Sequence, residues 1–154
     1  MAHLRTQIFD AVKARLVVIP RFSDPDKVVR GRKGAIKQEA LPGLTLTWSD
    51  SNEIADLRPF SGPNGEDGYD RRLPLSIVVH LRGDDPELEF DNICVEVESA
   101  MGAAIKLDGL VIEALLESER HYVNTQTGTS LCAGSINYRI AYKTLAADPQ
   151  QPAL

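Results

Sequence analysis

The strongest constraint on the fold is a strict two-residue alternation near the end of the chain, in "SINYRIAYKT", residues 135–144. Its apolar and aromatic side chains fall on one side, and its polar side chains fall on the other. The first set is Ile136, Tyr138, Ile140 and Tyr142, and the second is Asn137, Arg139 and Lys143. A period of two is that of a β-strand with one buried face. The chain must therefore build a sheet around this strand, whose polar face is directed at water, a substrate or another protein.

Further strands are predicted from the same kind of pattern. Residues 44–48 and 73–81 alternate clearly, and residues 53–57 form a shorter candidate. Residues 111–123 are interpreted as a strand, although their Leu, Glu and Ala also favour a helix. Pro74 has no N–H group to donate, so it predicts that its strand starts at an edge or joins the sheet only after this residue.

Two helices are predicted from apolar residues that recur every three or four positions. The first runs over residues 4–19 and ends at Pro20, and the second starts at Asp85, a good N-cap. Its apolar stripe, interpreted as core with no cofactor role, is Phe90, Ile93, Cys94, Val97, Met101 and Ala104. A chain of 154 residues with 43% hydrophobic content fits one domain. We assign it to residues 1–146, followed by a flexible C-terminal tail over residues 147–154.

Charge is distributed unevenly along the chain. Residues 1–37 carry nine basic and three acidic side chains, a charge of +6. Because the net charge of the whole chain is −5, the other 117 residues carry a charge of −11. Such asymmetry suits docking with copies or partners in a fixed orientation. The basic segment, residues 27–37, is alternatively a solvated loop. It has no interleaved aromatic residues, which disfavours nucleic-acid binding. It belongs to a long connection over residues 20–42 that contains one short extended piece at residues 27–30.

No pattern of catalytic or metal-binding residues is found. The histidines lie in separate predicted elements without metal-ligand spacing; they are His3, His80 and His121. There is no phosphate loop or nucleophile elbow, and the acidic loop at residues 64–70 lacks the ligand pattern of a calcium loop. Glu117 and Glu119 are expected on one face of a strand, where a solvated role is favoured over glycosidase chemistry. We therefore expect no enzyme activity, no cofactor and no metal.

The cysteines and the N-terminal segment indicate the compartment. Cys94 and Cys132 lie in apolar contexts and are interpreted as buried free thiols in a reducing compartment, with a disulfide as the alternative. The only apolar run near the N-terminus, residues 16–19, is short and follows several charges. We expect neither a signal peptide nor a membrane span there.

The apolar patterns follow one another in a fixed order along nearly the whole chain. They are "LRTQIFDAVKARL", "ALPGLTLTW", "LPLSIVVHLRG", "DNICVEVESAM", "LDGLVIEALLESE" and "INYRIAYKT", with a charged loop before the third. This order resembles the tail terminator proteins of long-tailed bacteriophages, the group that includes the minor tail protein U of siphophages. The Tyr-x-x-x-Tyr ending is similar to that family's last strand. The basic segment at residues 27–37 has no match in it.

The resemblance implies an α+β fold with a mostly antiparallel or mixed β-sheet and two main α-helices packed on one face. It also implies a hexameric ring that caps the tail tube, stops its polymerisation and offers its other side to the neck. The implied partners are further copies of the chain, the tail tube protein and a neck or head-completion protein, and DNA passes through the lumen without specific binding. The implied location is the head-proximal end of the tail in the virion, and the host cytoplasm during assembly. The alternatives are another head–tail connector or neck completion protein, and a small ligand-binding α/β module.

Three groups of residues are candidates for protein interfaces in such an assembly. The basic segment contributes Arg30, Arg32 and Lys33. The loop at residues 60–70 and its margin contribute Phe60, Glu66, Asp67, Tyr69 and Arg71, and the last strand contributes Arg139 and Lys143. Glycine and proline exclude regular structure from this loop, so we expect it to be mobile in the free subunit and ordered on a partner, anchored by Phe60 and Tyr69.

Overall fold

The computed structural model describes residues 2–31, 41–48, 52–102, 106–124 and 131–153. Within these ranges the helices are α1 (Leu4–Leu16) and α2 (Pro86–Gly102), with short 3₁₀ turns at η1 (Pro20–Phe22), η2 (Pro25–Lys27) and η4 (Leu107–Gly109). The strands are β1 (Val28–Arg30), β2 (Gly43–Trp48), β3 (Ile54–Arg58), β4 (Gly68–Arg82), β5 (Glu113–Asn124) and β6 (Leu131–Leu145). The predicted α+β fold, with two main helices and a mixed sheet, is confirmed.

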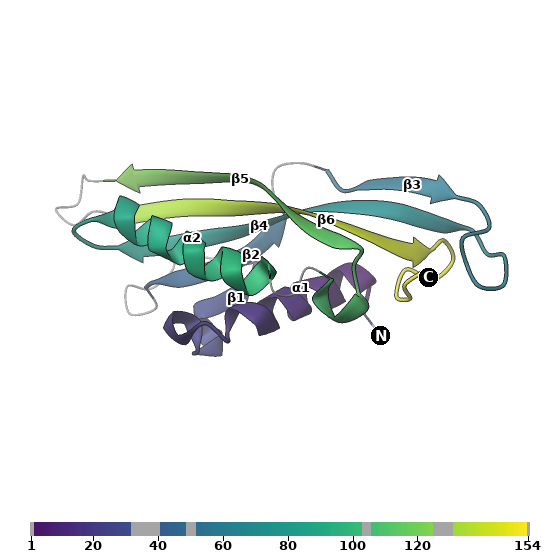
Figure 1. The fold of residues 1–154 in the computed structure, drawn as a ribbon, viewed down its shortest axis with the longest axis horizontal. Helices are drawn as coiled ribbons and strands as arrows, with labels where there is room; N and C mark the ends of the chain where they lie inside the picture. The colour runs from purple at the N-terminus through teal and green to yellow at the C-terminus, as the bar shows by residue number, and fades with distance from the viewer. Residues whose placement is uncertain (1, 32–40, 49–51, 103–105, 125–130, 154) are drawn as a thin grey trace.

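The sheet is long and narrow because β4 and β6 pair with each other over 15 residues each. The described strands form one sheet in the order β1-β2-β4-β6-β5, and β3 pairs with β4 beyond the end of β2. The β1–β2 pair is parallel and every other pair among them is antiparallel. Both helices lie on one face of this sheet (Figure 1). None of the described helices has the length and apolar character needed to cross a membrane.

The core lies between the helices and the sheet, and it contains the apolar residues that the two periodicities select. The helices contribute Leu4, Ile8, Val12, Leu16, Phe90, Ile93, Cys94, Val97 and Met101, and the two long strands contribute Leu73, Leu75, Ile77, Val79, Leu81, Ile136, Tyr138, Ile140 and Tyr142. Burial of each large apolar side chain stabilises the fold by about 1.5–3 kcal/mol relative to exposure. The aromatic side of the last strand therefore meets the helices.

Pro74 lies inside β4, so the prediction that its strand begins near this residue is wrong. The strand begins six residues earlier, at Gly68. Pro74 is aligned with Arg139 of β6 on one side. On the other side, the pairing with β2 ends at Leu75 and the pairing with β3 ends at Arg72. The proline thus occupies the position between two partner strands, where its missing N–H group interrupts neither ladder.

Residues 146–153 fold back onto the chain. The flexibility predicted for the tail over residues 147–154 stays a prediction. The carbonyl oxygen of Pro149 accepts the N–H of Leu4 at 2.9 Å, which supplies a partner at the open end of α1. The N–H of Ala153 donates to Lys143 in β6 at 3.1 Å, and the Ala153 side chain is buried. These contacts join residues from opposite ends of the sequence.

Candidate assembly surface on the open face of the sheet

One face of the sheet is not covered by the helices, and we call it the open face. Because side chains alternate along each strand, the register between strands assigns its members. They include Thr45, Thr47, Ile54, Asp56, Arg58, Asp70, Arg72, Pro74, Ser76, Val78, His80, Glu113, Leu115, Ser118, Arg120, Ser135, Asn137, Arg139, Ala141 and Lys143. The surface is mostly polar, and it runs along the full paired length of β4 and β6.

A hydrogen-bonded row of small polar side chains crosses the middle of the open face. Ser76 Oγ donates to Asn137 Oδ1 at 2.8 Å, and Asn137 Nδ2 donates to Ser118 Oγ at 3.1 Å and to Ser135 Oγ at 3.3 Å. This row links β4, β6 and β5 without a buried apolar contact. Ser76 is almost fully buried by its neighbours, so the row is a pre-organised part of the surface.

Ion pairs of alternating sign occupy the part of the open face near β3. Arg72 contacts Asp56 at 2.9 Å, and Arg139 pairs with Glu117, which lies at the bulge in β5. Two further cations, Arg58 and Lys143, both contact Asp70, the latter at 3.8 Å. Exposed pairs of this kind contribute only about 0–1 kcal/mol each, so these side chains exchange partners at little cost.

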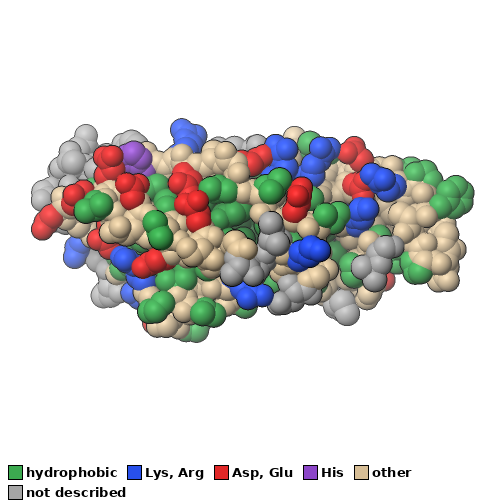
Figure 2. Space-filling model, viewed as in Figure 1, with side chains coloured by type: hydrophobic (Ala, Val, Ile, Leu, Met, Phe, Trp, Pro, Cys, Tyr) green, Lys and Arg blue, Asp and Glu red, His purple; other side chains and the backbone are tan. Residues whose placement is uncertain are grey.

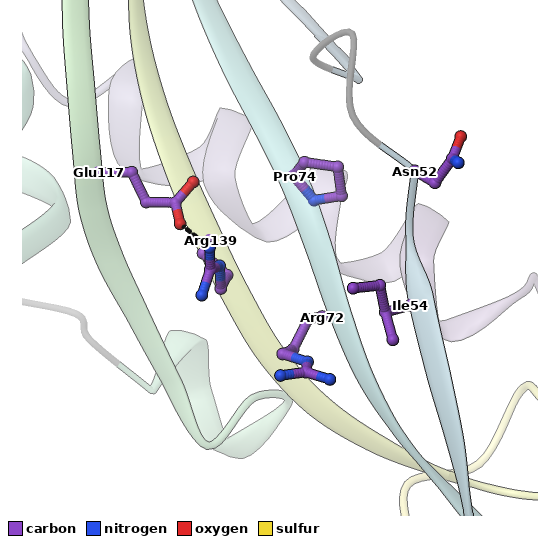
Figure 3. Close-up of a pocket in the computed structure, with 6 residues that line it drawn as sticks. All are labelled: Asn52, Ile54, Arg72, Pro74, Glu117 and Arg139. Carbon is purple, nitrogen blue, oxygen red and sulfur yellow. Dashed lines mark ion pairs between the residues drawn. The ribbon is translucent and has the colours of Figure 1, made fainter.

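A hollow of about 400 Å³ opens between these pairs. It is lined by Asn52, Ile54, Arg72, Pro74, Glu117 and Arg139, which come from β4, β5, β6 and the start of β3 (Figure 3). Both arginines are exposed and each already has a carboxylate partner. The hollow presents paired charges beside Ile54 and Pro74.

Arg139 and Lys143 lie on the polar side of the last strand, which is the open face, and their role at an interface stays a prediction. Arg71 differs. Its Nε donates to Thr144 Oγ1 at 2.9 Å, its head group lies 3.5 Å from Glu53, and its side chain is only 14% exposed. Arg71 has the same strand parity as the core residue Leu73, so its side chain is directed to the helix side. It holds the fold together at this point.

Arg71 belongs to an ionic cluster that sequence reasoning missed. Its centre is Glu53, whose side chain is 6% exposed. Arg5 of α1 donates to Glu53 at 2.5 Å, and the Tyr142 hydroxyl of β6 donates to the other carboxylate oxygen. Burial and the hydrogen bond to Glu53 raise the pKa of Tyr142. The Arg5 guanidinium also stacks 4.5 Å from the centre of the Trp48 ring. No spacing in the sequence relates these residues.

The loop before β4 has hydrogen bonds of its own. The N–H of Gly62 donates to the Glu66 carbonyl at 2.9 Å, and the Glu66 carboxylate accepts the N–H of Asn64 at 2.9 Å. Bonds from the backbone N–H groups of Glu66 and Asn64 lower the pKa of the Glu66 carboxyl. Asp67 accepts the N–H of Phe60 at 3.4 Å, and Phe60 is 81% exposed with a φ of 57°. That this loop becomes ordered only on a partner stays a prediction.

The predicted interface residues do not form a single surface. Arg30 lies at the end of β1, where it donates to Thr6 Oγ1 at 3.1 Å and stacks 4.1 Å above the Phe9 ring. Phe60 lies at the tip of the β3–β4 hairpin, and Tyr69 lies beneath Arg71 at 5.4 Å. Arg32 and Lys33 lie outside the described residues. The groups therefore belong to separate regions: the side of α1, the hairpin and the open face.

Acidic side chains gather over α2 (Figure 2), on a surface that we call the acidic ridge. It consists of Asp84, Asp85, Glu87, Glu89, Asp91, Glu96 and Glu98, with no Lys or Arg between them in the sequence. Arg21 of η1 contacts Glu89 at 2.6 Å and Glu96 at 3.0 Å. The acidic ridge therefore accounts for most of the net negative charge that the sequence places after residue 37.

Glu117 and Glu119 do not share a face, which corrects the expectation from simple alternation. A bulge between Leu116 and Ser118 shifts the pairing of β5 with β6. Glu119 therefore faces α2, where it lies with Cys94 and Glu98 and the three ligand atoms are within 4.8 Å of one another. Burial raises the pKa of the Cys94 thiol to about 12, and burial and Glu98 raise that of Glu119. The cluster joins α2 to β5 through the side chains of Cys94, Glu98 and Glu119.

Comparison with known proteins yields little. No protein family model and no curated protein sequence matches the chain. One solved structure that matches is a chain of the "Virion of native gene transfer agent (GTA) particle", with 10% sequence identity and a TM-score of 0.35, covering 86% of this chain and 93% of that chain. A TM-score this low carries no conclusion about fold or function.

Proposed function

We propose that the protein is a structural subunit of a phage-like particle, and specifically a tail terminator. It forms a ring that caps the tail tube, stops its polymerisation and presents its other side to the neck. The proposal includes no catalytic activity. The observation that carries it is the open face, a long polar surface with pre-formed side-chain contacts opposite the helices.

The open face fits the inner surface of a ring through which DNA passes. Strands of 15 residues extend about 50 Å, enough to form the wall of such a channel. The charges around the hollow cancel, because four cations face four carboxylates: Arg58, Arg72, Arg139 and Lys143 against Asp56, Asp70, Glu113 and Glu117. A nearly neutral wall avoids the strong, salt-dependent phosphate binding that would hold DNA in place.

Unlike surfaces on one subunit also support a ring. Head-to-tail association that closes on itself needs two different complementary patches on each copy. The acidic ridge on α2 and the basic segment that includes Arg30, Arg32 and Lys33 supply opposite charges. Replacement of these three residues by Glu should impair assembly and leave the melting temperature nearly unchanged. Replacement of the exposed Lys106, which lies outside the proposed contact surfaces, by Glu is the control. If the triple variant assembles at low salt as well as the control does, the basic segment does not contribute a contact between subunits.

Particles assembled without the protein test the proposed function. We expect tails of irregular or excessive length that lack heads, seen by electron microscopy, and recovery of uniform tails when the purified protein is supplied. Uniform tails that fail to join heads would instead identify a neck completion protein. Uniform tails already joined to heads would refute any role in tail completion.

A further inference from the structure

At one end of the sheet, β3 and β5 form the two outer edges, and residues of both strands lie in the same row across the sheet. Across one row of the sheet, Ile54 of β3 is aligned with Arg72 of β4, which is aligned with Ala141 of β6, and this with Glu113 of β5. Within the described residues, no strand pairs with the outer side of β3 or of β5. Their backbone N–H and C=O groups therefore form two open ladders that face in opposite directions.

The strand directions allow one copy to continue the sheet of another. From β3 through β4 and β6 to β5 every neighbour is antiparallel. Hence β3 and β5 run in opposite directions within one subunit. If a second copy is placed beside the first in the same orientation, its β3 runs antiparallel to the first copy's β5. The alternation is then preserved across the boundary between subunits.

Exposed apolar side chains mark both edges at this level. On β3 they are Ile54 and Leu57, which are 48% and 58% exposed. At the start of β5 they are Leu115 and Leu116, which are 45% and 42% exposed, and Ile112 just before the strand is 47% exposed. Soluble proteins usually protect a sheet edge with charges or proline, whereas here each edge offers leucine or isoleucine. The two patches are of similar character and lie on opposite sides of the subunit.

Charge disfavours the alternative in which β5 pairs with β5 of a second copy about a two-fold axis. The strand carries Glu113, Glu117 and Glu119 against Arg120, so two β5 strands would bring like charges together. On β3, Asp56 and Arg58 balance each other. A contact between β3 and β5 avoids this repulsion.

We propose that β3 of one copy pairs antiparallel with the N-terminal half of β5 of the next copy, so that neighbouring subunits form one continuous sheet. This inference rests on the proposed ring and names the contact that closes it. The two strands meet with a stagger along their length, as strands of any closed sheet do. The stagger places Leu57 of one copy opposite Leu116 of its neighbour, and both side chains lie on the helix side of the joined sheet. The open faces then join into one continuous surface.

A charge exchange tests this contact. Leu57→Lys and Leu116→Glu each place one unpaired charge at an apolar contact, and each should raise the protein concentration needed for half-assembly by about tenfold or more. A chain that carries both substitutions forms Lys–Glu pairs at every boundary, and its assembly should recover to within about threefold of wild type. Native mass spectrometry and light scattering measure the assembly, with melting temperature as the check on folding.

The matched control is Val18→Lys, at a residue just after α1 that is 77% exposed and belongs to neither edge strand nor to the acidic ridge. It should assemble as wild type. Single variants that also assemble as wild type, or a double variant that is worse than either single one, would overturn the edge contact and leave the terminator role standing. If particles that lack the protein have normal tails, the terminator role is wrong. The charge exchange in the purified protein then still tests whether β3 pairs with β5 of the next copy. Wild-type protein that forms no ring either in solution or on tails would overturn both.

Discussion

Glu53→Gln provides a sharp test of how the fold is held together. Glu53 is 6% exposed and accepts hydrogen bonds from Arg5 and Tyr142, while Arg71 lies 3.5 Å away. Glutamine keeps the size of the side chain but removes its charge, so two partly buried guanidinium groups lose their counter-charge. Breaking a buried ion pair from one side costs about 3–5 kcal/mol. Arg5 and Arg71 retain 23% and 14% exposure and Arg71 keeps Thr144, so we expect the lower end, about 3 kcal/mol.

Urea unfolding followed by fluorescence measures this loss, since the single tryptophan, Trp48, stacks against Arg5. Tyr142→Phe removes only one hydroxyl donor and should cost about 1 kcal/mol. Asp56→Asn is the matched control, because it breaks an exposed ion pair with Arg72 and should cost below about 1 kcal/mol. A loss for Glu53→Gln no larger than that of Asp56→Asn would refute the conclusion that Glu53 organises this end of the fold.

Three other perturbations follow from the packing of α2 on the sheet. Gly134→Ala should lower stability by about 1–3 kcal/mol in thermal melts, because its new Cβ would lie 2.2 Å from the Phe90 ring. Burial raises the pKa of the Cys94 thiol from its ordinary value of 9.0 to about 12. The thiol therefore contributes its full stabilisation below about pH 9, and this stabilisation is lost as the pH rises toward 12. Cys94→Ala should flatten this alkaline loss of stability in unfolding experiments. Burial and Glu98 raise the pKa of Glu119, so its contribution is present below its unfolded pKa of about 4.5 and is lost as the pH rises through the folded value. Glu119→Gln should therefore raise the unfolding midpoint at pH 7 and leave it unchanged at pH 4, and a decrease at pH 7 would contradict this account.

The prediction of α2 shows what local sequence chemistry specifies well. Asp85 accepts the N–H of Leu88 at 3.2 Å as the predicted N-cap, and Pro86 is the first helical residue. The predicted strand over residues 111–123 is also observed, because its neighbour β6 supplies a partner along nearly its whole length. Local interactions decide the start of the helix, whereas the strand depends on its pairing with β6.

The candidate site was predicted only in part, for reasons that particular residues make clear. Arg139 was assigned to the correct face because its strand alternates without interruption. Arg71 was predicted at an interface, and its position on the helix side was missed although a signal existed: it lies two residues before Leu73 and shares its parity. The bulge that separates Glu117 from Glu119 has no such signal, because it depends on how β5 pairs with β6.

The sequence by itself determined which side chains are buried along the described helices and along the long strands β4 and β6, because a period of two or of three to four residues is a property of the local backbone. It also determined that the chain combines helices with a sheet around the segment at residues 135–144. Only the tertiary structure decided that Glu53 meets Arg5 and Tyr142, that the carbonyl of Pro149 completes the start of α1, and that β3 and β5 form opposite edges at one level. These contacts join residues far apart in the sequence, and their energy depends on geometry that exists only after the sheet has formed.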